Sequence, residues 1–226
     1  MSMRPLRRDH HVRFLSEESI AHAALNCRRL GGYYNDGYFN ITDLVENVLR
    51  TKARNGPLRI VFFDAADDDE PAYVTFDPLT LRVDHEIWEL ARSGEPDARF
   101  IIAHEIGHLV LHDHDAKAFS TSPEDQIKFA PKGNSAEWQA NAFAAHLLLP
   151  SHIVAIIDDL QGLVACGVNK NLAQERLSAE RRAKCATTYN GDACPRCGNF
   201  TVVRIGNWIK CDTCGKKNWG FPWSAQ

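Results

Sequence analysis

The sequence has little that would place the protein in a membrane or on a polyanion. No apolar run approaches the roughly 20 residues that a membrane-spanning helix needs. Residues 1–14 are basic and lack the apolar stretch of a secretory signal. The formal net charge of -3 leaves no overall excess of positive charge for nucleic acid or an anionic membrane. We therefore expect a cytoplasmic protein without a membrane partner.

What is present is an ordinary globular composition, 44% hydrophobic and 24% charged, in a chain of 226 residues. This length suits one sizeable domain with a small appendage. Apolar periodicity and turn signals predict an α+β fold. The expected helices span 16–29, 40–50, 96–112, 134–150, 153–160 and 172–184, and the expected strands span 58–63 (buried), 72–76 and 81–84. The acidic stretch 64–70 is interpreted as a solvated hairpin loop, because it lacks the ligand spacing of an EF-hand. A linker at 190–192 predicts two domains, 1–188 and 189–226.

Disulfides are not expected, although the chain has seven cysteines. Four of them form two Cys-x-x-Cys pairs near the C-terminus, which is the spacing of metal ligands. Cys27, Cys166 and Cys185 are scattered along the chain. We interpret them as reduced thiols that pack as small apolar side chains.

The stretch His104-Glu105-Ile106-Gly107-His108 lies within the helix expected at 96–112. Residues four apart share a helix face, so both imidazoles are able to bind one metal ion from the same side. Glu105 projects at a neighbouring angle, where it reaches a water on the metal without binding the metal itself. Zinc lowers the pKa of such a water to about 7, and the glutamate takes its proton as a carbonyl is attacked. The alternative is a chance pair of histidines on an exposed helix.

Two histidines need a third protein ligand if the fourth position is to be left for water. Glu137 is the best candidate, near the start of the helix expected at 134–150. Asn141 follows one turn later on the same face, where it is able to accept a hydrogen bond from a ligand histidine. The alternative is that Glu137 closes a cap with Asn134.

Three other residues of this region carry weaker signals. Gly107 in mid-helix costs about 1 kcal/mol relative to Ala, which indicates that something packs closely against it. His112 and His114 are interpreted either as helix-end residues or as hydrogen-bonding partners of the metal ligands. The longer pattern that would make His114 a ligand needs a glycine at position 111, where this chain has Leu.

His104-Glu-Ile-Gly-His108-Leu-Val-Leu-His112 and Glu137-Trp-Gln-Ala-Asn141-Ala-Phe-Ala-Ala-His-Leu-Leu-Leu-Pro150 together resemble the ImmA/IrrE metallopeptidases. The resemblance covers roughly 16–184 and implies a zincin-like fold of the gluzincin type, with a small sheet beside two active-site helices. It implies that the histidines of the first motif, 104 and 108, and Glu137 bind a catalytic zinc, and that Glu105 is the base. Family members cleave helix-turn-helix repressors after stress or in mobile elements, so it also implies such a substrate. Where this chain has Gln139, the family often has a second glutamate.

The two C-terminal cysteine pairs are separated by thirteen residues, and each is followed by glycine. This spacing predicts one tetrahedral site of four thiolates, most simply a structural zinc, with iron as a minor alternative. Strands expected at 200–205 and 208–210 around Gly206-Asn207 make the module a zinc ribbon. Its core is too small to fold unaided, so the metal supplies much of the folding free energy. The predicted ligands are Cys194, Cys197, Cys211 and Cys214.

The ribbon leaves more than one function open. Its aromatic and basic residues fit either stacking on nucleic-acid bases or a small core that docks on the first domain. The whole chain is then either an enzyme that cuts a regulatory protein, or a zinc-ribbon module that binds nucleic acid or protein and carries a dormant, peptidase-like sensor. The complete set of His104, Glu105, His108 and Glu137 favours the enzyme, because a dormant site has no need of the base.

Overall fold

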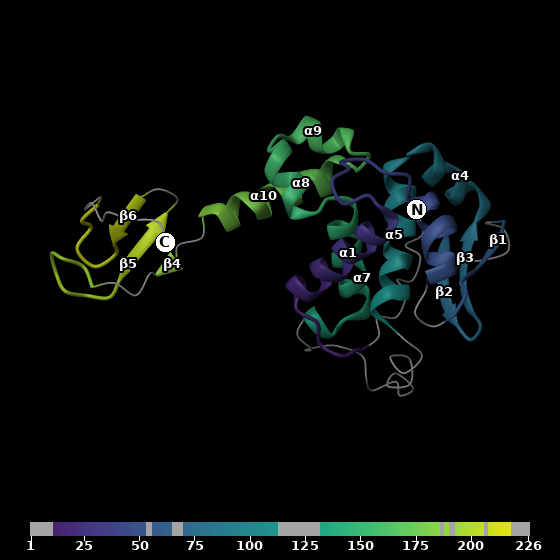
Figure 1. The fold of residues 1–226 in the computed structure, drawn as a ribbon, viewed down its shortest axis with the longest axis horizontal. Helices are drawn as coiled ribbons and strands as arrows, with labels where there is room; N and C mark the ends of the chain where they lie inside the picture. The colour runs from purple at the N-terminus through teal and green to yellow at the C-terminus, as the bar shows by residue number, and fades with distance from the viewer. Residues whose placement is uncertain are drawn as a thin grey trace, which may run out of the picture. The chain divides into compact units, whose positions relative to one another are not determined.

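The computed structural model describes residues 11–52, 56–64, 70–112, 132–185, 188–189, 193–205 and 208–217. The chain divides into two compact units, Met1–Arg176 and Leu177–Gln226, called here the helical unit and the C-terminal unit. The helical unit combines helices with a small sheet, which confirms the α+β class (Figure 1). The division falls inside helix α10 (Lys170–Cys185), and the domain boundary expected at residue 188 stays a prediction.

Helix α1 (Glu17–Gly31) begins and ends on signals that are visible in the sequence. The Ser16 hydroxyl accepts a hydrogen bond from the N–H of Ser19 at 3.2 Å, and acids occupy the first turn while arginines occupy the last. Both features stabilise a helix through its cap and its dipole. Gly32 then takes the left-handed conformation with a φ of 83°, which ends the helix. The buried face of α1 packs against α7 (Ala136–Leu148).

The helix expected at 40–50 is present, but it is built from three joined segments. These are α2 (Ile41–Asp43), the π-helical η1 (Leu44–Leu49) and α3 (Arg50–Lys52). The Asn40 side chain caps the first segment by accepting from the N–H of Thr42 at 3.0 Å. The π-helical turn was not predicted, because the same apolar stripe serves an α-helix and a short π-bulge.

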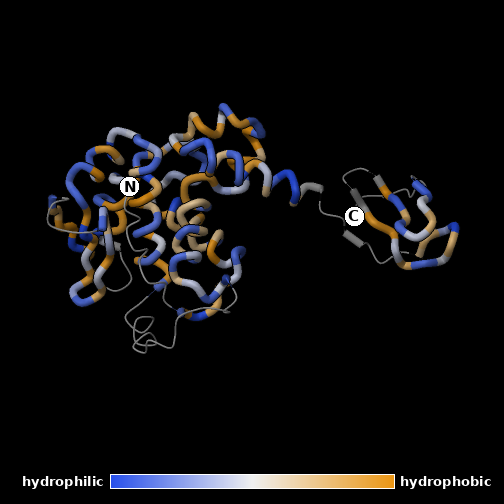
Figure 2. Tube along the Cα trace, turned by 180° about the vertical axis from the view of Figure 1, so that it is seen from behind, coloured by the Kyte–Doolittle hydropathy of each residue, from blue (hydrophilic) through white to orange (hydrophobic). Residues whose placement is uncertain are grey.

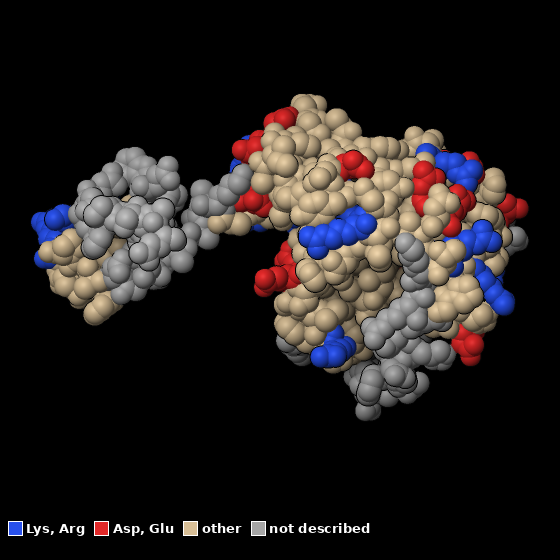
Figure 3. Space-filling model, viewed as in Figure 1, with Lys and Arg blue, Asp and Glu red and all other residues tan. Residues whose placement is uncertain are grey.

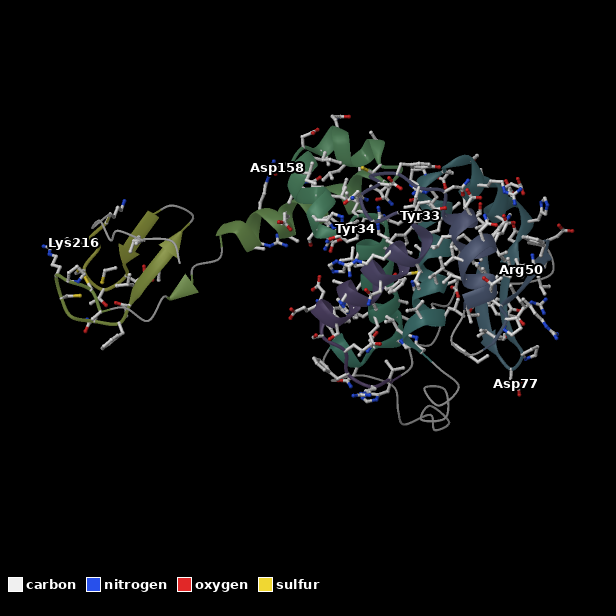
Figure 4. The ribbon with its side chains drawn as sticks, in the orientation of Figure 1. Tyr33, Tyr34, Arg50, Asp77, Asp158 and Lys216 are labelled. Atoms are coloured by element: carbon white, nitrogen blue, oxygen red, sulfur yellow. The ribbon has the colours of Figure 1, made fainter. Side chains whose placement is uncertain are left out.

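Strands β1 (Arg59–Phe63), β2 (Ala72–Phe76) and β3 (Leu79–Asp84) form a sheet of order β1-β3-β2. β2 and β3 pair antiparallel across the turn that contains Asp77 (Figure 4), whereas β1 pairs parallel with β3. The hairpin expected across 64–70 is therefore wrong, because β3 lies between the two strands; residues 65–69 lie outside the described part.

The prediction that the first strand is buried is also wrong. β1 forms one edge of the sheet, and its Val61 and Phe62 are 39% and 46% exposed. A run of β-branched and aromatic residues does not reveal whether a strand is central or at an edge, because both positions favour such residues.

Helix α4 (His85–Ser93) connects the sheet to the helices of the site and was missed by the sequence analysis. The Asp84 carboxylate caps it by accepting from the N–H groups of Glu86 and Ile87, at 2.8 and 3.1 Å. Gly94 ends it in the left-handed conformation. An acid at the N-cap and a glycine nine residues beyond the first helical position were signals that could have revealed it.

Helix α5 (Pro96–Leu111) is held in the core by a buried cation. Its N-terminus is capped by Glu95, and one turn later Arg99 is fully buried. The Arg99 guanidinium donates to the backbone carbonyls of Phe39 and Cys166, at 2.9 and 3.0 Å. These bonds attach α5 to two distant segments, and Cys166 lies at the end of α9 (Leu160–Ala165), which follows α8 (Ser151–Ile157).

The C-terminal unit has a second small sheet of order β4-β5-β6, antiparallel throughout. Its strands are β4 (Thr188–Tyr189), β5 (Val202–Ile205) and β6 (Trp208–Cys211). β5 and β6 confirm the two strands expected here, and the turn residues 206–207 lie outside the described part. The aromatic residues of the ribbon at positions 219–223 also lie outside the described part.

Two further observations concern the distribution of charged and hydrophobic residues and the length of the helices. On the face shown in Figure 3, acidic and basic side chains of the helical unit are interspersed, while in Figure 2 hydrophobic residues concentrate along its inner helices. Among the described residues, no single helix has the length and apolar composition to cross a membrane. The bent pair α7 and α8 passes that test of length and composition together, as core helices of globular proteins also do.

Candidate metal centres

The site of the helical unit forms where α5 and α7 pack against each other along their length (Figure 1). The two helices come close together at Gly107. A Cβ atom at this position would lie 3.0 Å from both Cα and the carbonyl oxygen of Ala140, and 3.2 Å from Cβ of Phe143. The glycine therefore permits a close crossing of the two helices, which brings the histidines of one towards the first turn of the other.

Three side chains converge at this crossing. His104 and His108, one turn apart on α5, place their Nε2 atoms 3.0 Å from each other. Glu137, in the first turn of α7, lies with Oε2 3.3 Å from Nε2 of His104 and with Oε1 3.5 Å from Nε2 of His108. Ser135, not Asn134, caps α7 by accepting from the N–H of Trp138. The carboxylate of Glu137 thus faces the histidines instead of closing a cap.

This donor set fits a small divalent metal ion. Bonds of about 2.0–2.1 Å to a tetrahedral zinc put neighbouring ligand atoms about 3.3 Å apart, close to the three separations found here. Two imidazole nitrogens and one carboxylate are also a set that leaves one position open. The ligand atoms of His104, Glu105 and His108 lie within 4.8 Å of one another, so the carboxylate of Glu105 is beside the same point.

The electrostatics of the three groups are those of a tightly coupled cluster. Burial opposes the charged form of His104, but its hydrogen bond with Glu137 and the nearby charges of Glu105 and Glu137 outweigh burial and raise the pKa of His104. Burial likewise opposes ionisation of Glu137, and the two histidines outweigh it and lower the pKa of Glu137 well below its usual range. Glu137 is therefore an anion at neutral pH, as a metal ligand must be.

Both histidine rings are held from behind by hydrogen bonds. Nδ1 of His104 lies 2.9 Å from Oδ1 of Asn141. Nδ1 of His108 lies 3.0 Å from Nδ1 of His112, and Nε2 of His112 lies 3.0 Å from Oε1 of Gln139. Burial and the neighbouring His108 lower the pKa of His112 to about 4, so this ring is neutral at physiological pH.

Gln139 is the member of the site that sequence reasoning missed. The sequence marked it only as the position where the ImmA/IrrE family often has a second glutamate. Nothing in the sequence showed that Gln139 is fully buried behind His112. Glu105 is 3% exposed. Two histidines without an assigned role lie in contacts elsewhere: Nε2 of His146 is 3.2 Å from Glu17, and His152 stacks on Tyr34, which is labelled in Figure 4. His114 lies outside the described residues.

Enlarging Gly107 should damage the crossing and the site together. We expect Gly107→Val to lower the free energy of unfolding by about 1–3 kcal/mol, because overpacked backbone contacts force the helices apart. Affinity for zinc should fall as well, since Glu137 moves away from the histidines. Chemical denaturation and a zinc titration measure the two effects.

Gly32→Ala is the matched control for Gly107→Val. Its left-handed φ makes alanine destabilising there too, yet no atom lies within 4 Å of the added Cβ. The control should lose stability and keep zinc affinity. If Gly107→Val keeps wild-type zinc affinity, the close crossing is not what assembles the site.

A second cluster lies in the C-terminal unit, where the sulfur atoms lie near the labelled Lys216 (Figure 4). The four thiols of Cys194, Cys197, Cys211 and Cys214 lie within 4.8 Å of one another. The Sγ atoms of the first and last are 3.6 Å apart, as are those of the middle two. These separations exclude a disulfide of about 2.05 Å. They fit four sulfurs at about 2.3 Å from one tetrahedral ion, which puts the sulfurs about 3.8 Å apart.

The two cysteine turns have the same backbone geometry. Gly198 donates to the carbonyl of Cys194 at 2.7 Å, and Gly215 donates to that of Cys211 at 2.8 Å. Both glycines have a φ near 70°, which explains their place after each pair. The amides of these glycines thus bond to carbonyls, and other backbone N–H groups lie at the sulfurs: that of Arg196 is 3.4 Å from Sγ of Cys194, and that of Asn199 bonds to Cys197.

One thiol of this cluster, that of Cys211, is made more acidic by its surroundings. The Thr201 hydroxyl, 3.5 Å from Sγ of Cys211, and backbone N–H groups outweigh burial and lower the pKa of Cys211 to about 6. The thiolate, not the thiol, is the metal ligand. Cys27, by contrast, is buried among apolar groups, which raises its pKa to about 12 and confirms it as a packed thiol.

Comparison with known proteins gives one family and one local similarity. Residues 57–161 match the family Peptidase_M78, described as the IrrE N-terminal-like domain. A stretch of 38 residues is 60% identical to the vitamin B12-dependent ribonucleotide reductase of Bradyrhizobium diazoefficiens, covering 16% of this chain and 3% of that reductase. The chain therefore spans a small fraction of the length of this relative. No solved structure matches the chain.

Proposed function

We propose, from the premise that residues 57–161 form an IrrE N-terminal-like peptidase domain, that the chain is a zinc-dependent endopeptidase that cuts a regulatory protein. The premise gives a metallopeptidase type of function. The observation that supports the finer proposal is the cluster of His104, His108 and Glu137, in which the two Nε2 atoms lie 3.0 Å apart and each lies 3.3–3.5 Å from one carboxylate oxygen. We propose a second, structural zinc for the four thiols of the C-terminal unit.

The residues of the site have distinct tasks in peptide hydrolysis. His104, His108 and Glu137 would hold the zinc ion, which when bound polarises the scissile carbonyl and lowers the pKa of water. Glu105 accepts one proton from the attacking water as its oxygen adds to the carbonyl carbon. The same carboxyl group then gives this proton to the amide nitrogen as the C–N bond breaks. Asn141 and His112 orient the two imidazoles and take no part in proton transfer to the substrate.

The proposed substrate is a helix-turn-helix transcriptional repressor, whose cleavage would release gene expression after stress or in a mobile element. Its support is the resemblance of the two active-site motifs to the ImmA/IrrE family. We place the reaction in the cytoplasm, where thiolate ligands stay reduced. Nucleic-acid binding by the C-terminal unit stays a prediction.

The decisive experiment is a cleavage assay with purified full-length protein. The substrates are the helix-turn-helix proteins encoded beside it, incubated with and without a chelator and analysed by mass spectrometry. We expect one defined cut, lost with chelator and regained when zinc is added back. No cut in any of these proteins, with zinc bound at the histidines, would contradict the repressor proposal and favour a dormant, metal-binding sensor.

A further inference from the structure

We propose that Gln139 and His112 are positioning residues that hold His108 in the tautomer with hydrogen on Nδ1, so that its Nε2 lone pair points towards His104 and Glu137. This inference rests on the proposed metal site, but it concerns the direction of hydrogen bonds that exist without metal. It assigns a task to Gln139, which the proposed reaction does not use.

The direction of the chain of bonds is set at Gln139. Its Nε2 lies 2.8 Å from the carbonyl oxygen of Arg13 and 2.6 Å from that of Gly133. A carbonyl oxygen only accepts, so the NH2 end of the amide must face both. The opposite orientation would bring three oxygens together in a fully buried position. Oε1 of Gln139 is therefore fixed as an acceptor aimed at His112.

The same reasoning then passes through His112 to the metal site. Because Oε1 only accepts, Nε2 of His112 must carry the hydrogen of that 3.0 Å bond. A neutral imidazole has a single ring hydrogen, so the Nδ1 atom of His112 is an acceptor. Nδ1 of His108, 3.0 Å away, must then be the donor. A neutral His108 consequently has its lone pair on Nε2, the atom that faces Glu137.

The first residue of this series of hydrogen bonds, Gln139, is held in place by the N-terminal segment, which we define as residues 11–15. Val12 donates to the carbonyl of Asn134, and Leu15 donates to that of Gly133, at 2.9 and 3.0 Å. The Asn134 side chain adds a bond of 3.1 Å to the carbonyl of Val12. These bonds hold the carbonyl of Arg13 in place beside Gln139, so the ring orientation at position 108 depends on a segment far away in the sequence.

The hydrogen-bonding partner of His104 is Asn141, and it differs from the partners behind His108 in its exposure to solvent. This difference allows a comparison within one site. Asn141 is exposed, whereas Gln139 and His112 are buried. Water is able to replace the oxygen of Asn141, but no water replaces a buried acceptor when the side chain is changed. Loss of Gln139 or His112 should therefore weaken metal binding much more than loss of the Asn141 amide.

The test is a Co²⁺ titration of the full-length protein, because thiolate ligands give a near-ultraviolet charge-transfer band that the histidine site lacks. We expect Gln139→Met and His112→Leu to weaken the histidine site by about 10–100-fold, the usual effect of losing a hydrogen bond to a metal-binding histidine. The thiolate site should keep its affinity as an internal reference. His112→Gln should restore most of the loss, because its amide is able to accept from His108 and donate to Gln139.

One comparison and one control accompany these variants, and a second measurement is independent of metal. Asn141→Ala should weaken the histidine site much less than Gln139→Met does, for the reason of exposure given above. His146→Leu is the control, because this buried histidine of α7 bonds to Glu17 in the first turn of α1 and has no part in the chain of bonds to His108; the histidine site should keep its wild-type affinity. In ¹⁵N NMR of metal-free protein, His108 should carry hydrogen on Nδ1 in the wild type and should lose this preference in His112→Leu.

The proposal is overturned if Gln139→Met binds Co²⁺ at the histidines as tightly as wild type, or if His146→Leu weakens that site equally. Should Gln139→Met fail to fold, the comparison of His112→Leu with His112→Gln decides. Failure of the peptidase proposal is seen separately, as a wild-type protein that binds metal but cuts nothing. If the wild type binds no metal at the histidines, the NMR tautomer alone decides.

Discussion

Glu105→Gln is expected to abolish cleavage while leaving the metal in place. The change removes the group that accepts the proton of the attacking water, and general bases of this kind contribute about 10²–10⁴-fold to rate. Glutamine has the same size as glutamate, so the buried position stays filled. The turnover number on the cleaved repressor should therefore fall by that factor, with zinc content per chain unchanged.

Glu89→Gln on α4 is the matched control for Glu105→Gln. This glutamate is exposed, and its ion pair is with Arg92 on the same helix, at 3.6 Å. Such surface changes alter stability by no more than about 0.5 kcal/mol, and activity should stay at the wild-type level. If Glu105→Gln keeps its turnover number, the base lies elsewhere. If it loses zinc instead, Glu105 is a ligand and the three-ligand arrangement is wrong.

The parts of this site that sequence reasoning reached are those governed by local geometry. The spacing of His104 and His108 places both rings on one helix face whatever the rest of the fold does. The place of Glu137 needed one further step, the demand of a metal ion for a third ligand. Gln139 was out of reach, because its two carbonyl partners come from residues 13 and 133, which no local pattern connects. A buried amide and an exposed amide look alike in a sequence.

In the fold, too, local features could be predicted and contacts between distant segments could not. Helices α1 and α7 could be predicted from their caps and apolar faces, because those signals lie within a few residues. The pairing of β1 with β3, rather than with its neighbour β2, is a contact between separated segments. It leaves β1 at an edge of the sheet, so the strand is more exposed than its composition suggested. Position in a sheet is decided by topology, which periodicity does not encode.

Removal of metal should unfold the C-terminal unit and leave the helical unit folded. Among the described residues of the C-terminal unit, one buried cluster consists of Cys194, Val202 and Cys211, with Ile209 and Cys214 packed against it. Most of this cluster is thus thiol, and once these thiols lose a metal ion they become partly charged groups that repel one another. Zinc binding by four thiolates is worth about 10–16 kcal/mol at pH 7, far more than a few buried aliphatic side chains provide.

The effect should be visible residue by residue in hydrogen exchange. With zinc bound, the amides of β5 and β6 should exchange slowly; after chelation, or in Cys211→Ser, they should exchange at the rate of an unfolded chain. Amides of α1 should stay protected, because the apolar core around that helix contains no ligand. Cys166→Ala is the control, since this buried thiol lies outside both clusters and its loss should leave the zinc content per chain unchanged. Continued protection of β5 and β6 without metal would show that their own packing holds the strands, and the four thiols would then need a role other than folding.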